Sequence, residues 1–356
     1  MHQLFNRSKM YLDRRNFLKI VGVSSGLQMM PGLGFGQKDE VIIGHNTHKY
    51  KVVVGWGMLD AQKTPVNDCH EMVEDAAGRL IMCTNETKNN ILIYDKSGKL
   101  LETWGNSYPG AHGLTIFNEG EKQYLLICDN SRNQVIKTDL KGKEIFKIEY
   151  PKETGEYLYP SQFVPTETAV NPLNGDIYVV DGYGKNFVIQ YDSKGKYIRH
   201  WGGNGLEEGK FKCNHGVVVD TRNPSKPTLI ITSRQQTCWK RFTLDGKYIS
   251  TIHLPGSFIC RPVLKGENLY GAVYRSTSEE YPNSGYIQIL DKNDKVVSSP
   301  GASEPIYQNG QLLEQRKSDP AKVFMHPHDV CIDGDGSIYI PQWASKKTYP
   351  VKLERV

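Results

Sequence analysis

Three histidines recur in the same local context along the chain. Each is followed by glycine or aspartate and then by a short apolar run, in His112–Ile116, His215–Val219 and His328–Ile332. Imidazole nitrogens bind zinc and other transition metals, and a catalytic zinc site combines three protein ligands with one open position. At equivalent positions of a repeated fold, the three imidazoles would converge on one ion. We therefore expect these histidines to hold a metal, with zinc the first candidate; the alternative is three unrelated, hydrogen-bonded histidines.

Other residues at the equivalent points of further repeats extend this set. His70, in the segment HEMVE, would be a fourth ligand or a proton-transfer group. Thr166 takes the same place in another repeat and is followed by Glu167. His326 lies two residues before His328, and we interpret it either as structural or as a residue that supports the ligands without binding the metal.

The strands that must position these side chains recur along the sequence as copies of one repeat. Each copy contains an alternating strand, a polar turn, a second strand, an Asp-x-x-Gly-Lys type of turn and a final strand. This pattern is typical of antiparallel meanders rather than helices. The regular copies span residues 78–105, 122–149, 175–202 and 227–252, a looser copy spans 267–297, and the last spans 336–356.

The repeats predict an all-β, six-bladed propeller. The last copy ends without its final strand, and Tyr50–Gly57 has the form of the missing strand. We therefore expect the N-terminal strand to complete the last blade and close the ring, which removes exposed sheet edges. The alternative fold is a β-sandwich. On the repeats alone, a binding scaffold without catalysis is the simplest function.

The first 36 residues have the features of an export signal. The segment Asp13–Lys19 reads DRRNFLK and precedes an uncharged stretch, which resembles a twin-arginine signal. We expect residues 1–36 to be removed on export to the periplasm or cell exterior and residues 37–356 to form the propeller. The alternative is a basic, disordered N-terminus. No later run of 18 apolar residues predicts a membrane span.

Charge and cysteine spacing exclude several classes of protein. Most of the formal net charge of +5 comes from the first 36 residues, which carry five Lys or Arg and one Asp. A nearly neutral body without a basic cluster does not favour nucleic-acid binding. The seven cysteines have no CxxC spacing, so they predict no zinc ribbon, and they leave disulfide pairing and oligomeric state open.

The repeat grammar resembles that of NHL-repeat proteins, and four segments carry a more specific resemblance. They read GAHGLTIF, DIYVVDGYGKNFVIQYDSKGKYIRHWG, FKCNHGVVVD and HPHDVCIDGDGSIYI. From Tyr50 to the C-terminus, the sequence is similar to peptidyl-α-hydroxyglycine α-amidating lyases. The resemblance implies a six-bladed propeller, a zinc ion on the three register histidines, and a calcium ion on Asp329 and the carbonyls of Met72 and Leu114. It also implies that Tyr183 acts as a base and that Arg234 holds a substrate carboxylate.

The sequence departs from that family at several positions. Asn85 stands where the family has a second arginine, Gly184 stands where it has a cysteine, and His70 is an additional histidine. We therefore expect a metal-dependent lyase or hydrolase for a small hydroxylated or anionic substrate. The alternatives are a binding propeller with a structural metal, or a lactonase-like hydrolase. Three further residues are candidates for a rebuilt pocket: Arg261, Arg275 and Trp343.

Overall fold

The computed structural model describes residues 40–277, 284–318 and 321–356. Residues 40–356 form one compact unit. The expected export signal at residues 1–36 lies outside the described residues. Among the residues described, no helix combines the length and apolar character needed to cross a membrane.

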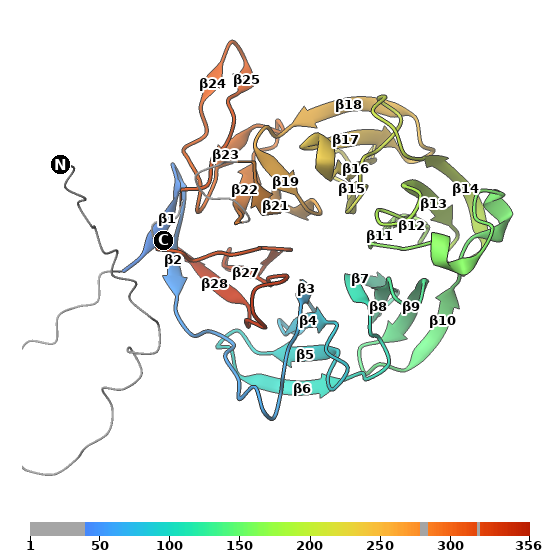
Figure 1. Cartoon of the computed structure of the whole chain (residues 1–356), viewed down its shortest axis with the longest axis horizontal. Coiled ribbons are helices and arrows are strands. Elements are labelled where there is room, and N and C mark those ends of the chain that lie inside the picture. Colours follow the sequence, from blue (N-terminus) through green and yellow to red (C-terminus); the bar gives the residue numbers. More distant parts are fainter. Residues whose placement is uncertain (1–39, 278–283, 319–320) are drawn as a thin grey trace, which may run out of the picture. The chain divides into compact units, whose positions relative to one another are not determined.

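Six antiparallel sheets follow one another around a ring, as Figure 1 shows, so the predicted six-bladed propeller is confirmed. The inner strand of each sheet faces the centre of the ring. Blades 1 to 4 each have four strands in sequence order. Their bounds are β3 (Cys69–Glu74), β4 (Leu80–Thr84), β5 (Ile91–Tyr94) and β6 (Leu100–Trp104); β7 (Ala111–Glu119), β8 (Lys122–Asp129), β9 (Gln134–Asp139) and β10 (Glu144–Ile148); β11 (Glu167–Val170), β12 (Ile177–Val180), β13 (Phe187–Tyr191) and β14 (Tyr197–Gly202); and β15 (Val217–Asp220), β16 (Thr228–Ser233), β17 (Cys238–Thr243) and β18 (Tyr248–His253).

Blades 5 and 6 are less regular than the others. In blade 5, two short strands pair with the same long neighbour, and a small hairpin follows the blade. Blade 5 contains β19 (Ser257–Ile259), β20 (Val263–Lys265), β21 (Asn268–Ser276), β22 (Tyr286–Leu290) and β23 (Val296–Ser298). The hairpin consists of β24 (Tyr307–Gln308) and β25 (Gln311–Leu312). Blade 6 contains β26 (Cys331–Ile332), β27 (Ile338–Ile340), β28 (Val351–Arg355), β2 (His48–Val53) and β1 (Ile42–His45).

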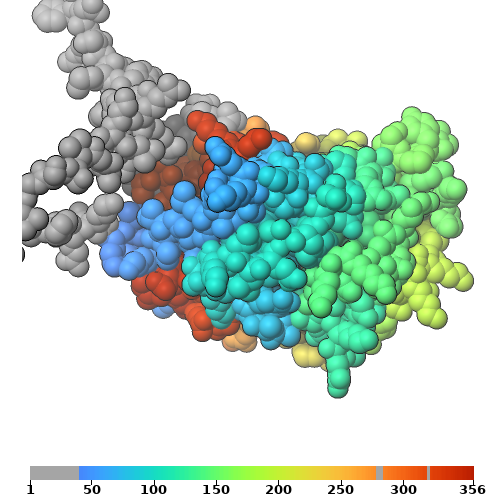
Figure 2. Space-filling model, turned by 90° about the horizontal axis from the view of Figure 1, so that it is seen from below, coloured from blue at the N-terminus to red at the C-terminus, as the bar shows by residue number. Residues whose placement is uncertain are grey.

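The two ends of the propeller meet in blade 6. Strand β2 pairs antiparallel with β28, with Tyr50 opposite Arg355 and Val52 opposite Leu353. Strand β1 adds a fifth strand outside β2. The expected closure by the N-terminal strand is therefore confirmed. Figure 2 shows the ring from the side, with the blue N-terminal strands beside the red C-terminal segment.

The Asp-x-x-Gly-Lys turns and the Trp-Gly ends of the outer strands fit together between blades. In the turn of blade 1, Asp95 Oδ1 accepts the N–H groups of Ser97 and Lys99 at 2.9 and 3.0 Å. In blade 2, a side chain on Gly142 would come within 2.6 Å of the Trp104 ring of blade 1, and Trp104 Nε1 donates to the Leu140 carbonyl at 3.1 Å. Gly246 of blade 4 contacts Trp201 of blade 3 in the same way, whereas Gly195 of blade 3 packs on Phe146 of blade 2.

Hydrophobic burial takes place between blades. Six apolar clusters lie in the described region, one at each boundary between neighbouring blades. In the cluster between blades 1 and 2, for example, Ile81 and Ile93 of one sheet pack with Leu114 and Leu125 of the next. Since a single sheet cannot bury both faces, the blades are stable only as a ring. All seven cysteines are buried thiols without disulfide partners.

Candidate metal and substrate site

Two consecutive residues at the inner end of each blade form two layers across the centre of the ring. We call the first the imidazole layer: His70, His112, Thr166, His215, Cys260 and His328. We call the second the carboxylate layer: Glu71, Gly113, Glu167, Gly216, Arg261 and Asp329. Each blade contributes one residue to each layer, at or just before its inner strand.

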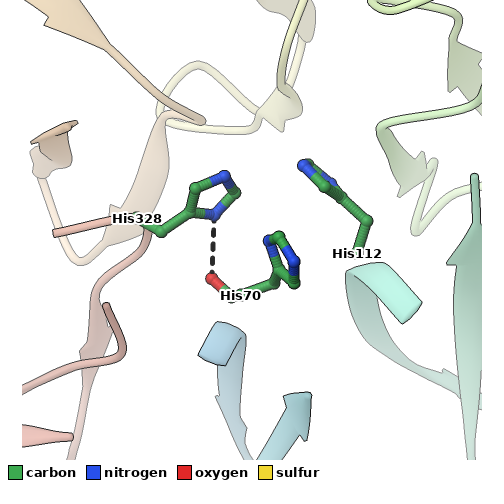
Figure 3. A group of neighbouring side chains, drawn as sticks. All are labelled: His70, His112 and His328. Carbon is green, nitrogen blue, oxygen red and sulfur yellow. Dashed lines mark hydrogen bonds between the residues drawn. The ribbon is translucent and has the colours of Figure 1, made fainter. Parts of the chain in front are cut away.

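The imidazole layer brings the three register histidines together. The ring centroids of His112 and His328 are 4.8 Å apart, those of His215 and His328 are 4.8 Å apart, and those of His112 and His215 are 4.9 Å apart. All three side chains are buried. His70 also belongs to this group, since its ring centroid lies 4.5 Å from that of His112 (Figure 3). The structure therefore gathers four imidazoles from four blades.

Backbone hydrogen bonds orient two of these rings for metal binding. The Nδ1 atom of His112 lies 2.8 Å from the Thr166 carbonyl, and that of His328 lies 3.0 Å from the His70 carbonyl. A carbonyl fixes Nδ1 as the donor and leaves Nε2 as the free ligand atom. Burial lowers the pKa of His112, His215 and His328 well below the ordinary value, so their imidazoles are neutral. Neutral imidazole nitrogens are what a transition metal requires, and two of the three rings are oriented to offer them, so the chemistry of these residues fits a transition metal.

Two overlapping sets of ligand atoms meet at His328. Nitrogens of His70, His112 and His328 lie within 4.8 Å of one another, and so do ligand atoms of His215, Cys260 and His328. Cys260 was not identified from the sequence as a site residue. Its signal was register, since the segment Cys260–Leu264 aligns with the histidine segments of the other blades. Burial raises the pKa of the Cys260 thiol to about 12, which disfavours the thiolate when no metal is bound.

Tyr183 reaches the imidazoles from the β12–β13 loop. Asp181 fixes this loop by accepting the N–H groups of Val164 and Lys185, each at 2.7 Å. The Tyr183 hydroxyl lies 3.2 Å from His112 Nε2 and 3.0 Å from His215 Nε2. Tyr183 is 42% exposed, so one side of its ring is open to solvent. Desolvation by the surrounding protein atoms raises the pKa of its hydroxyl, and the Arg234 cation opposes this shift.

Arg234 completes this group from the β16–β17 loop, where it begins the short helix η4 (Arg234–Gln236). One guanidinium nitrogen lies 3.3 Å from the Tyr183 hydroxyl. The guanidinium stacks 5.5 Å from the centre of the Tyr183 ring and 4.7 Å from that of Tyr274. Two aromatic faces thus hold the cation beside the imidazoles. Tyr274, which holds Arg234 on one side, was not identified from the sequence, and no motif marked it.

The other candidate residues lie outside this point of convergence. Trp343 packs against the rings of Tyr274 and His326, with centroids 6.1 and 5.8 Å away. Arg275 lies 5.4 Å from the centre of the Tyr274 ring. Both side chains contact Tyr274, whose ring also packs on the guanidinium of Arg234.

Two of the three departures from the family pattern, Asn85 and Gly184, have local structural reasons. The amide of Asn85 is bound within its own blade, because its oxygen accepts the Asp68 N–H at 3.0 Å and its nitrogen lies 3.3 Å from the Asp68 carboxylate. A neutral amide beside a carboxylate does not replace an anion-binding arginine. At Gly184, an added Cβ would lie 2.1 Å from Asp181 Oδ1 and 2.4 Å from the Gln162 carbonyl. A cysteine does not fit there without a change of the loop.

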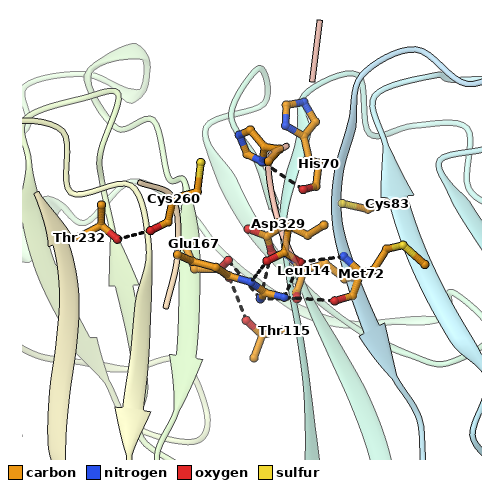
Figure 4. Close-up of polar contacts among 12 residues, drawn as sticks. His70, Met72, Cys83, Leu114, Thr115, Glu167, Thr232, Cys260 and Asp329 are labelled. Carbon is orange, nitrogen blue, oxygen red and sulfur yellow. Dashed lines mark hydrogen bonds and ion pairs between the residues drawn. The ribbon is translucent and has the colours of Figure 1, made fainter. Parts of the chain in front are cut away.

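Of the three residues expected to bind calcium, Asp329 belongs to the carboxylate layer, and Met72 and Leu114 each directly follow a residue of this layer. Arg261 donates to both carboxylate oxygens of Asp329 at 2.7 and 2.8 Å, to the Leu114 carbonyl at 3.1 Å and to the Met72 carbonyl at 3.2 Å. Figure 4 shows Asp329, Leu114, Met72 and Glu167 gathered around these bonds. A guanidinium therefore stands where the sequence resemblance implies a calcium ion, and the residues present do not fit that ion. Arg261 belongs to this layer, not to a substrate pocket with Tyr183.

Sequence comparison finds relatives of this chain among amidating enzymes. No protein-family model matches the chain. Peptidylglycine alpha-amidating monooxygenase of Rattus norvegicus is 26% identical over 263 residues, which cover 71% of this chain and 24% of that protein. Peptidyl-alpha-hydroxyglycine alpha-amidating lyase 1 of Drosophila melanogaster is 26% identical over 275 residues, covering 69% of this chain and 45% of that protein. The chain thus spans about a quarter of the length of the rat protein.

Solved structures support the fold alone. A gluconolactonase from Xanthomonas campestris superposes with a TM-score of 0.59 at 12% identity, covering 89% of this chain and 95% of the other. At that identity, the likeness does not carry the lactonase activity to this chain. The sequence relatives include lyases of the amidating type. The resemblance to amidating lyases is therefore confirmed, and the chain is a six-bladed propeller similar in sequence to these enzymes.

Proposed function

We propose that this protein is a metal-dependent lyase that acts on a small hydroxylated substrate with an anionic group, in the manner of peptidylamidoglycolate lyase. One observation carries the proposal. The Tyr183 hydroxyl lies within 3.3 Å of an imidazole nitrogen of His112, one of His215 and a guanidinium nitrogen of Arg234. A candidate base, a candidate anion-binding group and candidate metal ligands thus meet at one point.

The three register histidines would hold the metal through their free nitrogens. A divalent ion bound there supplies Lewis acidity and favours the phenolate form of a neighbouring tyrosine. His70 contributes a fourth imidazole, and its Nδ1 atom is buried without a hydrogen-bond partner among the described residues. In this proposal, His70 carries a proton between the reacting group and solvent.

The residues of the chain then have separate tasks in the cleavage of a carbinolamide. Arg234 binds the substrate carboxylate and is kept in place by Tyr183 and Tyr274. Tyr183 accepts the proton of the substrate hydroxyl. The carbon–nitrogen bond breaks as the carbonyl of glyoxylate forms, and the departing amide nitrogen takes up a proton. The expected export signal would place this reaction outside the cytoplasm.

The test combines metal analysis with turnover of an α-hydroxyglycine compound. We expect about one transition-metal ion per chain and release of glyoxylate. Tyr183→Phe removes only the hydroxyl, so it should keep the metal and lower kcat by a factor on the order of 10² to 10⁴. Tyr159→Phe is the matched control, because Tyr159 is 53% exposed and lies in another loop, and it should leave kcat unchanged. Full activity of Tyr183→Phe would refute the role of the tyrosine.

A second function, a binding propeller with a closed metal site, has one observation in its favour. The nitrogens of His70, His112 and His328 are within 4.8 Å of one another, so His70 is also placed to be a ligand. Four histidine ligands would leave no open position for a substrate. If His70→Ala loses the metal as fully as His328→Ala does, and no hydroxy-acid, carbinolamide or sugar substrate is turned over, the binding function is favoured.

A further inference from the structure

The carboxylate layer contains a buried charge network centred on Arg261. The side chains of Glu71, Glu167 and Asp329 have at most 1% of their surface exposed, and Arg261 has 9% exposed. The guanidinium lies 3.2 Å from a Glu71 oxygen and 3.3 Å from a Glu167 oxygen, in addition to its paired contacts with Asp329. Three carboxylates from blades 1, 3 and 6 therefore share one cation from blade 5.

Backbone oxygens complete the surroundings of this cation. Arg261 also donates to the carbonyls of Met72 in blade 1 and Leu114 in blade 2. Carboxylate and carbonyl oxygens around one point form the ligand set that a hard divalent cation prefers. Here, the N–H groups of the guanidinium donate hydrogen bonds to these oxygens in place of an ion.

The position of Arg261 depends on the glycines of the same layer. A Cβ on Gly216 would lie 2.3 Å from both the Cα and the Cβ of Arg261, so only glycine lets blade 5 approach blade 4 this closely. Beyond Arg261, the inner strands surround a cavity of about 580 Å³ lined largely by apolar side chains, among them Val73, Phe117 and Val170. Arg261 thus separates the imidazole layer from this cavity.

We infer that Arg261 is a built-in replacement for a structural calcium ion, and that the propeller is independent of calcium. The guanidinium joins blades 1, 2, 3 and 6 through the oxygens that would otherwise bind the ion, and its charge repels a second cation at the same place. This inference does not depend on the proposed lyase activity. It concerns the cohesion of the ring, which an inactive protein would share.

The test measures calcium content and thermal unfolding of the full chain. Wild-type protein purified with millimolar calcium and then desalted should contain no stoichiometric calcium. Its Tm should be the same in calcium and in EGTA. Stoichiometric calcium in the wild-type protein, or a lower Tm in EGTA, would overturn the inference.

Arg261→Ala should convert the layer into a calcium-dependent one. The substitution leaves three buried carboxylates without their cation, so the variant should unfold at a lower temperature in EGTA. Calcium at 100-fold excess over its Kd should raise the Tm by about 5 °C. The matched control is Arg241→Ala, because Arg241 pairs with Asp220 and Asp294 in another part of the ring and should give no calcium response.

A second variant guards against failure of Arg261→Ala to fold. Arg261→Met combined with Asp329→Asn and Glu167→Gln keeps the volume of the layer while removing the carboxylate ligand and most of the charge, so it should fold and ignore calcium. A soluble Arg261→Ala protein whose Tm does not respond to calcium would contradict the inference. The inference would be supported if the triple variant is soluble without calcium and the Arg261→Ala protein folds only with calcium.

Discussion

Gly216→Ala is the substitution that most directly probes the contact between blades 4 and 5. The added methyl group would lie 2.3 Å from the Cα and from the Cβ of Arg261. Carbon atoms in contact are about 3.5 to 4.0 Å apart, so the two backbones must separate by more than about 1 Å. Neither contacting atom is the end of a flexible side chain. The strain therefore has to be relieved by movement of the blade or of Arg261.

The cost follows from the hydrogen bonds that such a movement breaks. A shift of about 1 Å takes the bonds from Arg261 to Asp329 and Leu114, now 2.7 to 3.1 Å long, beyond hydrogen-bonding distance. Overpacking costs about 1 to 3 kcal/mol, and disruption of a buried ion pair costs about 3 to 5 kcal/mol. A destabilisation of about 4 kcal/mol corresponds to a fall in Tm on the order of 10 °C for a domain of this size.

Thermal unfolding of the variant beside a matched glycine substitution tests this estimate. An added Cβ on Gly209 meets no atom within 4 Å, so Gly209→Ala should be neutral or stabilising by up to about 1 kcal/mol. A Gly216→Ala protein with the Tm of the Gly209→Ala protein would refute the close approach of the two blades. It would also refute the placement of Arg261.

Three further predictions concern the histidines and the thiols. Structural metal sites contribute about 10 to 16 kcal/mol of binding free energy, and loss of one ligand removes about 3 kcal/mol of it. Alanine at His112, His215 or His328 should therefore weaken metal binding by at least about 100-fold, whereas His70→Ala should change it by less than about 10-fold. Competition with a chromophoric chelator measures both affinities. Burial lowers the pKa of His70 to about 3, so the unfolded chain binds a proton below pH 6.5 that the folded chain does not. Metal-free wild-type protein should therefore lose about 1.4 kcal/mol of stability per pH unit between pH 6.5 and 3 relative to His70→Asn, as denaturant titrations would show. All seven cysteines are buried, so a thiol reagent should label the native protein far more slowly than the unfolded protein, with seven groups reacting after unfolding.

The fold was predictable because the repeat encodes both the strand and its neighbour. The turn at Asp95–Lys99 has a recognisable sequence motif, and similar motifs occur in later blades. The ring closure was also predictable, since the last copy lacks a strand. The predicted segment Tyr50–Gly57 overlaps the observed strand β2 (His48–Val53), which begins two residues earlier and ends before the turn at residues 54–57. The hairpin β24–β25 and the doubled inner strand of blade 5 follow no repeat, so no sequence pattern predicts them.

The site was predictable where register defined it and unpredictable where distance between blades defined it. Register brought together the imidazoles of His112, His215 and His328. The role of Arg261 depends on how closely blade 5 approaches Gly216, which no local pattern encodes. Tyr274 contacts Arg234 across two blades for the same reason. Contacts between side chains of different blades can be identified only when the positions of the strands in three dimensions are known.

The two layers also complement each other in charge. The imidazole layer is neutral without a metal, whereas the layer beneath it combines three carboxylates with the single cation of Arg261. Burial raises the pKa of Glu71 well above its ordinary range, and Arg261 opposes this shift. One guanidinium therefore leaves two negative charges uncompensated when all three carboxyls are ionised. A divalent metal on the histidines would place two positive charges beside this layer. These charges would favour ionisation of all three carboxyls, Glu71 included, so the proposed ion and Arg261 together would balance the charge at the centre of the propeller.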